Sequence, residues 1–244
     1  ILDDTDTPMA QQRWVFTLYL CGDSATLTDV LPVLHSLGLD VHDEHPYAID
    51  RSDGIPCWAY EFGVALAADM TLDPDHLGDV EARFTEAFVQ IWRQNAEVDA
   101  FNELVLRCGI DWRAAAMLRA YARYLRQCGF AYGTNHVASV LGAHRDVTRG
   151  LVELFAAQFD PRLGDSADPA EVLDRLRTAV GQVISLDADR VLSAFVAMVT
   201  ATSRTNFYVP DDAAPAHATA RVMSFKLRTR EIAQAPEPRP MHEI

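Results

Sequence analysis

Residues 84–129 decide the fold, running from Phe84-Thr-Glu-Ala-Phe-Val-Gln-Ile-Trp92 to Leu118-Arg-Ala-Tyr-Ala-Arg-Tyr-Leu125 and on to a glycine. Apolar side chains recur here every three or four residues, which is the period of helices with one buried face. Neighbouring helices of this kind bury each other's apolar faces, so the stretch predicts a helical core. We place four residues in that core: Trp92, Phe101, Trp112 and Leu118.

The composition is that of an ordinary globular protein. The 244 residues are 49% hydrophobic and 23% charged, enough for one large or two small domains. A net charge of −14 argues against a nucleic-acid or anionic-membrane surface, which needs clustered Lys and Arg. No apolar run approaches a membrane span, and no signal-peptide pattern opens the chain.

The four cysteines are scattered, with no pair at metal-binding or redox spacing. We therefore expect reduced, buried thiols, as in a cytoplasmic protein. Because the chain begins without Met and stops in what looks like a strand at Ile244, we expect it to be part of a longer polypeptide.

Upstream of the helical stretch, the sequence predicts a β-α-β-β-α unit. Strands are expected at 13–21, 39–49 and 57–66, where β-branched, aromatic and alternating residues gather. A helix capped at Thr26 or Thr28 and ending at Gly38 separates the first two, and a second helix covers 79–95. This order is the start of a ferredoxin-like fold.

Downstream, the pattern is mainly helical. Helices are expected over about 101–106, 112–127, 135–141, 146–158, 169–184 and 185–202, then a linker at 211–218, a strand at 220–227 and an extended tail. The predicted class is α+β, with an α+β unit at 1–98, a helical region at 99–210 and a linker, strand and tail at 211–244.

Two local clusters suggest chemistry. His42-Asp-Glu-His45 holds metal-ligand residue types, but in a strand alternate side chains face opposite sides, so the four cannot converge and we predict no metal site. Arg119, Arg123 and Arg126 follow one helix flank; they form either an anion or domain-docking face or a solvated flank, and we favour the solvated flank. No glycine-rich dinucleotide turn, P-loop or nucleophile elbow occurs, so the sequence predicts no catalytic residue.

The chain resembles the large-type NAD-specific glutamate dehydrogenases. The resemblance runs from Leu31 to Ile244 and rests on these residues: Trp92, Phe101-Asn102, Leu104-Val105-Leu106, Trp112-Arg113, Leu118-Arg119, Tyr124-Leu125, Ser203–Tyr208, Ser224–Leu227 and Pro238–Met241. It implies a large cytoplasmic homo-oligomer that deaminates L-glutamate to 2-oxoglutarate and ammonia with NAD. It also implies that the catalytic lysine and nucleotide fold lie beyond Ile244, so the segment itself holds no cofactor.

Residues 14–66 resemble an ACT domain, a small regulatory fold that often binds amino acids. The resemblance implies six candidate ligand-binding residues: Gly22, Asp23, Ser24, Thr26, Asp40 and His42. Ala25 stands where ligand-binding members usually have glycine, and Asp23 would repel a ligand carboxylate. Assembly is therefore favoured over binding of an amino-acid effector.

We accordingly predict a regulatory and oligomerisation segment of a glutamate dehydrogenase. Its expected partners are its own catalytic domain and further copies, through the ACT-like and helical surfaces. The alternative is a free-standing ACT-type module that senses an amino acid and has no attached enzyme.

Overall fold

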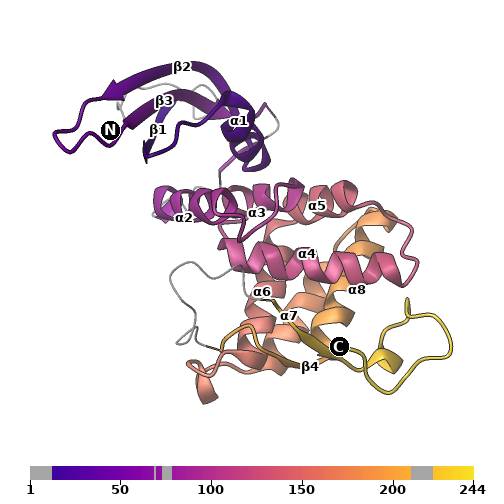
Figure 1. Cartoon of the computed structure of the whole chain (residues 1–244). Coiled ribbons are helices and arrows are strands. Elements are labelled where there is room, and N and C mark those ends of the chain that lie inside the picture. The colour runs from indigo at the N-terminus through magenta and orange to yellow at the C-terminus, as the bar shows by residue number, and fades with distance from the viewer. Residues whose placement is uncertain (1–12, 69, 73–78, 210–221) are drawn as a thin grey trace.

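The computed structural model describes residues 13–68, 70–72, 79–209 and 222–244. A three-stranded sheet with its helix lies at one end, a helical body follows, and a two-stranded sheet lies near the C-terminus (Figure 1). This confirms the predicted α+β class with an ACT-like unit first. No helix among the described residues is long and apolar enough to cross a membrane.

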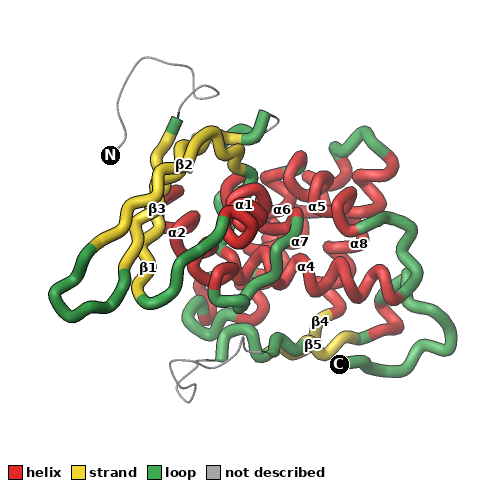
Figure 2. Tube along the Cα trace, turned by 45° about the horizontal axis from the view of Figure 1, so that its top comes forward, coloured by secondary structure: helices red, strands yellow, loops and turns green. Residues whose placement is uncertain are grey.

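The first sheet contains β1 (Trp14–Cys21), β2 (Leu39–Ile49) and β3 (Cys57–Leu66) in the antiparallel order β1-β3-β2. β2 and β3 have the predicted bounds, because alternating residues between turn residues define both strands. Figure 2 shows α1 (Leu27–Ser36) beside the sheet, facing the helical body.

Aromatic rings join the sheet to α2 (Val80–Trp92). Phe16 on β1 lies with its ring centroid 4.6 Å from that of Phe88 and 5.5 Å from that of Phe84. The inner face of the sheet therefore packs on α2, the helix that begins the apolar stretch at 84–129.

The helical body is built from short helices with clear start signals. After α2 come α3 (Glu103–Arg107), α4 (Trp112–Gln127), α5 (Thr134–Ala143), α6 (Arg145–Phe159), α7 (Pro169–Gly181) and α8 (Leu186–Ala201), with 3-10 turns η3 (Ala100–Asn102), η4 (Gly164–Ser166) and η5 (Thr229–Glu231). Asp111 caps α4, because its carboxylate accepts a hydrogen bond from the Ala114 amide at 2.7 Å. Pro169 fits the first turn of α7, where no amide hydrogen is needed.

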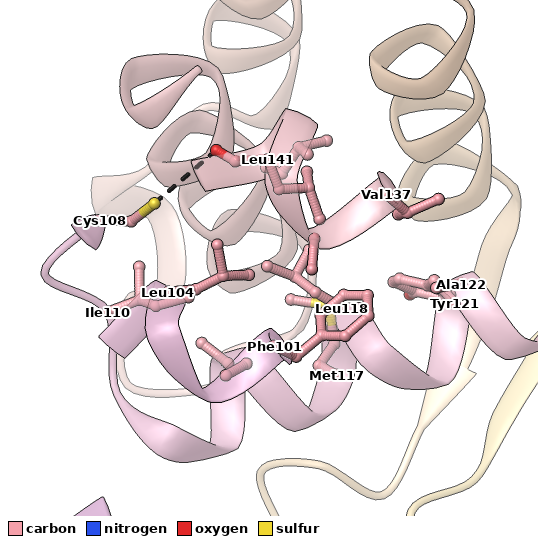
Figure 3. Packing of buried hydrophobic residues seen from close by; sticks show 14 of the residues in the cluster. Phe101, Leu104, Cys108, Ile110, Met117, Leu118, Tyr121, Ala122, Val137 and Leu141 are labelled. Atoms are coloured by element: carbon pink, nitrogen blue, oxygen red, sulfur yellow. Dashed lines mark hydrogen bonds between the residues drawn. The ribbon is translucent and has the colours of Figure 1, made fainter. Parts of the chain in front are cut away.

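The core is centred on α4, whose apolar face meets η3, α3 and α5 (Figure 3). Phe101 and Leu118 are fully buried, as predicted. Trp92 and Trp112 lie only half-buried at the edge of the core, which corrects the prediction that both are core residues. The Trp112 indole N–H donates to Glu86 Oε1 at 3.0 Å, and this need for a polar partner holds one edge of the ring at the surface.

A second sheet pairs β4 (Thr202–Thr205) with β5 (Phe225–Leu227). β5 is the end of the predicted strand 220–227, of which 220–221 lie outside the described residues, as does the predicted linker 211–218. No strand was predicted at β4, whose first residue, Thr202, was placed at the end of the preceding helix. Leu227 also bridges to Glu243, so the tail returns to this sheet.

The cysteine prediction is wrong for one pair. Cys21 and Cys57 face each other across β1 and β3 and form a disulfide. The register brings together residues 36 apart in the sequence, which spacing rules cannot detect. Cys108 and Cys128 are free thiols, and burial raises the pKa of the Cys108 thiol to about 12.

Candidate functional site

The turn from β1 to α1 is the place where an ACT-type ligand was expected. Gly22 adopts a φ of +97°, a left-handed conformation that favours glycine, and its amide donates to Pro56 O at 2.8 Å. Asp23, Ser24 and Thr26 follow it and are exposed. The turn is therefore accessible, as a ligand site requires.

The amides of this turn are nevertheless used by the chain itself. The Ala25 N–H donates to Tyr60 Oη at 3.2 Å, and the Thr26 N–H donates to Asp29 Oδ2 at 3.0 Å. Thr26 Oγ1 also donates to Asp29 Oδ2, at 2.6 Å. The bond from the Thr26 amide to Asp29 belongs to a capping box at the start of α1, so the Ala25 and Thr26 amides are both occupied within the chain.

Asp29 supplies the negative charge that the helix N-terminus favours. Hydrogen bonds from the Thr26 side chain and amide lower the pKa of the Asp29 carboxyl, so it stays ionised at neutral pH. An incoming amino-acid carboxylate would meet this anion as well as the one on Asp23. The negative charge that the start of α1 would attract is thus already supplied by the chain, which weighs against binding of an anion there.

The remaining two predicted ligand residues, Asp40 and His42, lie at the other end of the sheet. Asp40 pairs with Ala65, whereas the turn follows the Cys21–Cys57 pair. The eight steps along β3 from Cys57 to Ala65 span about 26 Å, so the six residues do not form one site. The separation follows from the strand directions: β1 and β2 are both antiparallel to β3, so α1 carries the chain back and β2 starts at the end of the sheet opposite the turn.

The His42–His45 stretch gains a feature that the sequence did not show. The pairing of β2 with β3 shifts between Val41 and Asp43, which leaves His42 in a bulge. Asp43 and His45 share a face, with His45 Nε2 3.7 Å from Asp43 Oδ1, and both side chains are largely exposed. Among the described residues, no group of three or more His, Cys, Asp or Glu could hold a metal ion.

A partly buried polar cluster joins the ACT-like unit to the helical body. Arg119 on α4 donates from Nε to Asp99 Oδ2 at 2.6 Å and from Nη2 to Asp99 Oδ1 at 2.8 Å. Its Nη2 also donates to Asn102 Oδ1 at 2.8 Å. Asn102 Nδ2 in turn donates to Ser36 Oγ at the end of α1, at 3.1 Å. We call Ser36, Asp99, Asn102 and Arg119 the junction cluster.

The junction cluster corrects the interpretation of the arginine flank. Arg119 is only 4% exposed, so it is not solvated. Arg123 pairs with the exposed Glu97, and Arg126 is exposed, so the solvated interpretation holds for those two. The two-pronged Arg119–Asp99 contact fixes both distance and orientation. It therefore sets how the segment after α2 sits on α4.

A surface depression of about 480 Å³ lies between α7, α8 and η5. Its charged lining residues are Arg177, Asp189 and Glu231. Ser193 Oγ donates to Asp189 at 3.4 Å, but no histidine lines the depression. It therefore lacks the base that would activate a serine nucleophile.

Three family models match the chain one after another. They are described as "Glutamate dehydrogenase, ACT3 domain" over residues 5–77, "Glutamate dehydrogenase, helical motif 3" over 96–161, and "Bacterial NAD-glutamate dehydrogenase, catalytic domain" over 175–244. The chain belongs to the large-type NAD-specific glutamate dehydrogenases. Ser36 lies in the first match and the other junction residues lie in the second, so the cluster joins two named parts of the family.

Relatives in three bacteria bear the name NAD-specific glutamate dehydrogenase. The protein of Mycobacterium tuberculosis is 39% identical over 242 residues, covering 97% of this chain and 14% of its own length. The proteins of Halomonas elongata and Pseudomonas aeruginosa are 37% and 36% identical, over 93% and 97% of this chain and 14% and 15% of their own lengths. The glutamate dehydrogenase segment thus spans about one seventh of these relatives.

The catalytic-domain match begins earlier than expected. It covers 175–244, which includes most of α7, all of α8 and both strands of the second sheet. The sequence placed the whole catalytic domain beyond Ile244. The segment therefore includes a stretch of that domain's sequence, although no catalytic residue can be assigned in it.

Proposed function

We propose that this chain is a regulatory and assembly segment of an NAD-dependent glutamate dehydrogenase, and that catalysis occurs elsewhere in the polypeptide. The full enzyme would convert L-glutamate to 2-oxoglutarate and ammonia with NAD, in the cytoplasm. The observation that carries this proposal is the unbroken order of ACT3, helical-motif and catalytic-domain matches along one chain.

Within that enzyme, the segment connects the ACT-like unit to the catalytic-domain stretch and holds the two in place. We call a segment with this role a joint. The junction cluster holds α1 against α4, and α4 in turn packs on α8, which lies in the catalytic-domain match. The Tyr121 hydroxyl on α4 lies 2.7 Å from Thr202 Oγ1 at the end of α8. Since Thr202 Oγ1 donates to Met198 O, it accepts the hydrogen bond from Tyr121. Polar contacts therefore run from the ACT-like unit to the catalytic-domain stretch.

The segment also contributes to a homo-oligomer, through the ACT-like unit and the helical region. The outer face of the first sheet, opposite α2, supports this proposal because it presents large apolar side chains to solvent. Val15, Tyr19 and Tyr47 are 68%, 70% and 50% exposed. Contiguous exposed apolar side chains are typical of interaction surfaces.

The competing function is a free-standing module that senses an amino acid. Two observations weigh against it. First, the Ala25 and Thr26 amides before α1 already donate to Tyr60 and Asp29, and the Asp29 carboxylate already carries a negative charge there. Second, residues 175–244 match a catalytic-domain model. We therefore favour a joint attached to an enzyme.

The proposal is tested by producing the complete polypeptide that contains this segment alongside the 244-residue segment. We expect glutamate-dependent reduction of NAD, followed at 340 nm, from the complete polypeptide and none from the segment. Light scattering of the complete polypeptide should give a multiple of the subunit mass. Activity in the segment alone, or a complete polypeptide without glutamate-dependent activity, would contradict it.

A further inference from the structure

The end of the first sheet carries a sulfur pair that the proposed function does not use. Cys21 closes β1 directly opposite Cys57, which opens β3, with their Cα atoms 4.2 Å apart. The next backbone hydrogen bond, from Gly22 N–H to Pro56 O, shows that the cysteines occupy a non-hydrogen-bonded position, where facing side chains lie closest. The register of the sheet therefore keeps the two sulfur atoms within bonding reach whether or not the bond is formed.

The two cysteines differ in access. Cys21 is exposed on the outer face of the sheet, whereas Cys57 is only 5% exposed. A small molecule in solution therefore reaches the sulfur of Cys21 first.

A positive charge is held against both sulfur atoms. Arg51, in the loop between β2 and β3, directs Nη1 to within 3.8 Å of Cys21 Sγ and 3.9 Å of Cys57 Sγ. Asp53 fixes the guanidinium, because its carboxylate accepts hydrogen bonds from Arg51 Nε at 3.1 Å and Nη2 at 2.5 Å. A cation beside a sulfur favours the thiolate, which is the nucleophile in thiol–disulfide exchange.

We propose that Cys21 and Cys57 are a reversible redox couple that exchanges with small disulfides, with Cys21 as the entry sulfur and Arg51 as a positioning residue. The Cys21 thiolate attacks the small disulfide, forms a mixed disulfide and releases one small thiolate. The Cys57 thiolate then attacks Cys21 Sγ and releases the second. The pair gives up two electrons, and the small disulfide accepts them and becomes two thiols.

The oxidised bond closes the chain around α1 and β2, at the point where β1 leads into the α1 turn. Oxidation therefore fixes the start of the joint to the sheet covalently, and reduction leaves that end held by hydrogen bonds and packing.

The test uses the reduced 244-residue chain in glutathione buffers of different ratios, with alkylation and peptide mass spectrometry. We expect a Cys21–Cys57 linked peptide that appears and disappears reversibly, while Cys108 and Cys128 remain alkylated as internal controls. In Cys57→Ser, glutathione should stay attached to Cys21. Two thiols at every ratio, or equally fast glutathione attachment to Cys57 in Cys21→Ser, would overturn the proposal.

The role of Arg51 has its own controls. Arg51→Gln should slow the first exchange step by about threefold or more, and Arg51→Lys should restore part of the rate because it restores the charge. Arg230→Gln, which alters an exposed arginine outside the ACT-like unit, should react at the wild-type rate. Thermal midpoints of the reduced variants should match, so a rate difference is not a folding defect. An unchanged rate in Arg51→Gln would overturn the assignment of Arg51.

Discussion

Arg119 is the cation of the junction cluster, and only 4% of its surface is exposed. In the sequence it belongs to a stripe of exposed arginines, yet it lies between Ala115 and Ala122 on the helix surface, and both are buried. That neighbourhood is the signal that could have placed Arg119 on the inner face of α4. Its partner Asp99 could not have been found the same way, because it lies in a loop segment before η3.

At this residue we expect a large cost of substitution. Arg119→Met should lower the free energy of unfolding by about 3–5 kcal/mol, because it leaves the Asp99 carboxylate largely buried without its cation. Arg126→Met, on the exposed flank, should stay within about 0.5 kcal/mol of wild type. Urea unfolding gives both values. A loss below about 1 kcal/mol for Arg119→Met would show that the junction cluster does not hold the segment together.

Leu118 tests the core itself. Because its side chain is fully buried, Leu118→Ala should cost about 2–5 kcal/mol through lost apolar contacts and the cavity left behind. Leu186→Ala is the matched control, since Leu186 is 61% exposed and its truncation should cost about 0.5 kcal/mol or less. A urea-unfolding change under about half a kcal/mol for Leu118→Ala would place Leu118 on the surface.

For single helices and strands, the sequence predicts the bounds that local signals determine. The bounds of β2, β3 and α4 follow from alternation, turns and a cap. β4 escaped prediction because it is four residues long, polar, and begins directly at the end of α8. The disulfide depended on register, which one strand cannot reveal about another, and the ligand site depended on the end of the sheet at which β2 starts. The sequence therefore located the α1 turn but could not show that Asp40 and His42 lie far from it.

The residues before α4 and α2 test how much a side-chain cap stabilises a helix. Asp111→Ala should destabilise the protein by about 1 kcal/mol, because the Ala114 amide loses its acceptor at the start of α4. Asp79→Ala removes the residue before α2, whose side chain makes no capping hydrogen bond, and should have a smaller effect. Thermal or urea unfolding compares the two. Equal losses would show that the Asp111 hydrogen bond does not stabilise α4.

For the whole molecule, we propose a joint that holds the ACT-like unit and the catalytic-domain stretch in place. The family matches name the parts, and the polar contacts from Ser36 to Arg119 and from Tyr121 to Thr202 connect them. The sequence resemblance predicted this identity, because it rests on residues spread over nearly the whole chain. It could not show the early start of the catalytic-domain match, since that boundary has no local signal.

A joint of this kind should not bind NAD. The chain has no glycine-rich turn between a strand and a helix, the feature that holds a pyrophosphate against a helix N-terminus. Calorimetric titration of NAD into the segment should give no saturable heat. Binding with a micromolar dissociation constant would contradict this expectation.

The central claim is that the ACT-like unit acts as a joint and does not sense amino acids. A thermal-shift screen of the twenty amino acids against the segment tests it most directly. We predict no saturable rise in Tm, because the Ala25 and Thr26 amides already donate to Tyr60 and Asp29. The Asp29 carboxylate also already places a negative charge at the start of α1. Reproducible, saturable stabilisation by one amino acid, abolished in Ser24→Trp, would contradict the account.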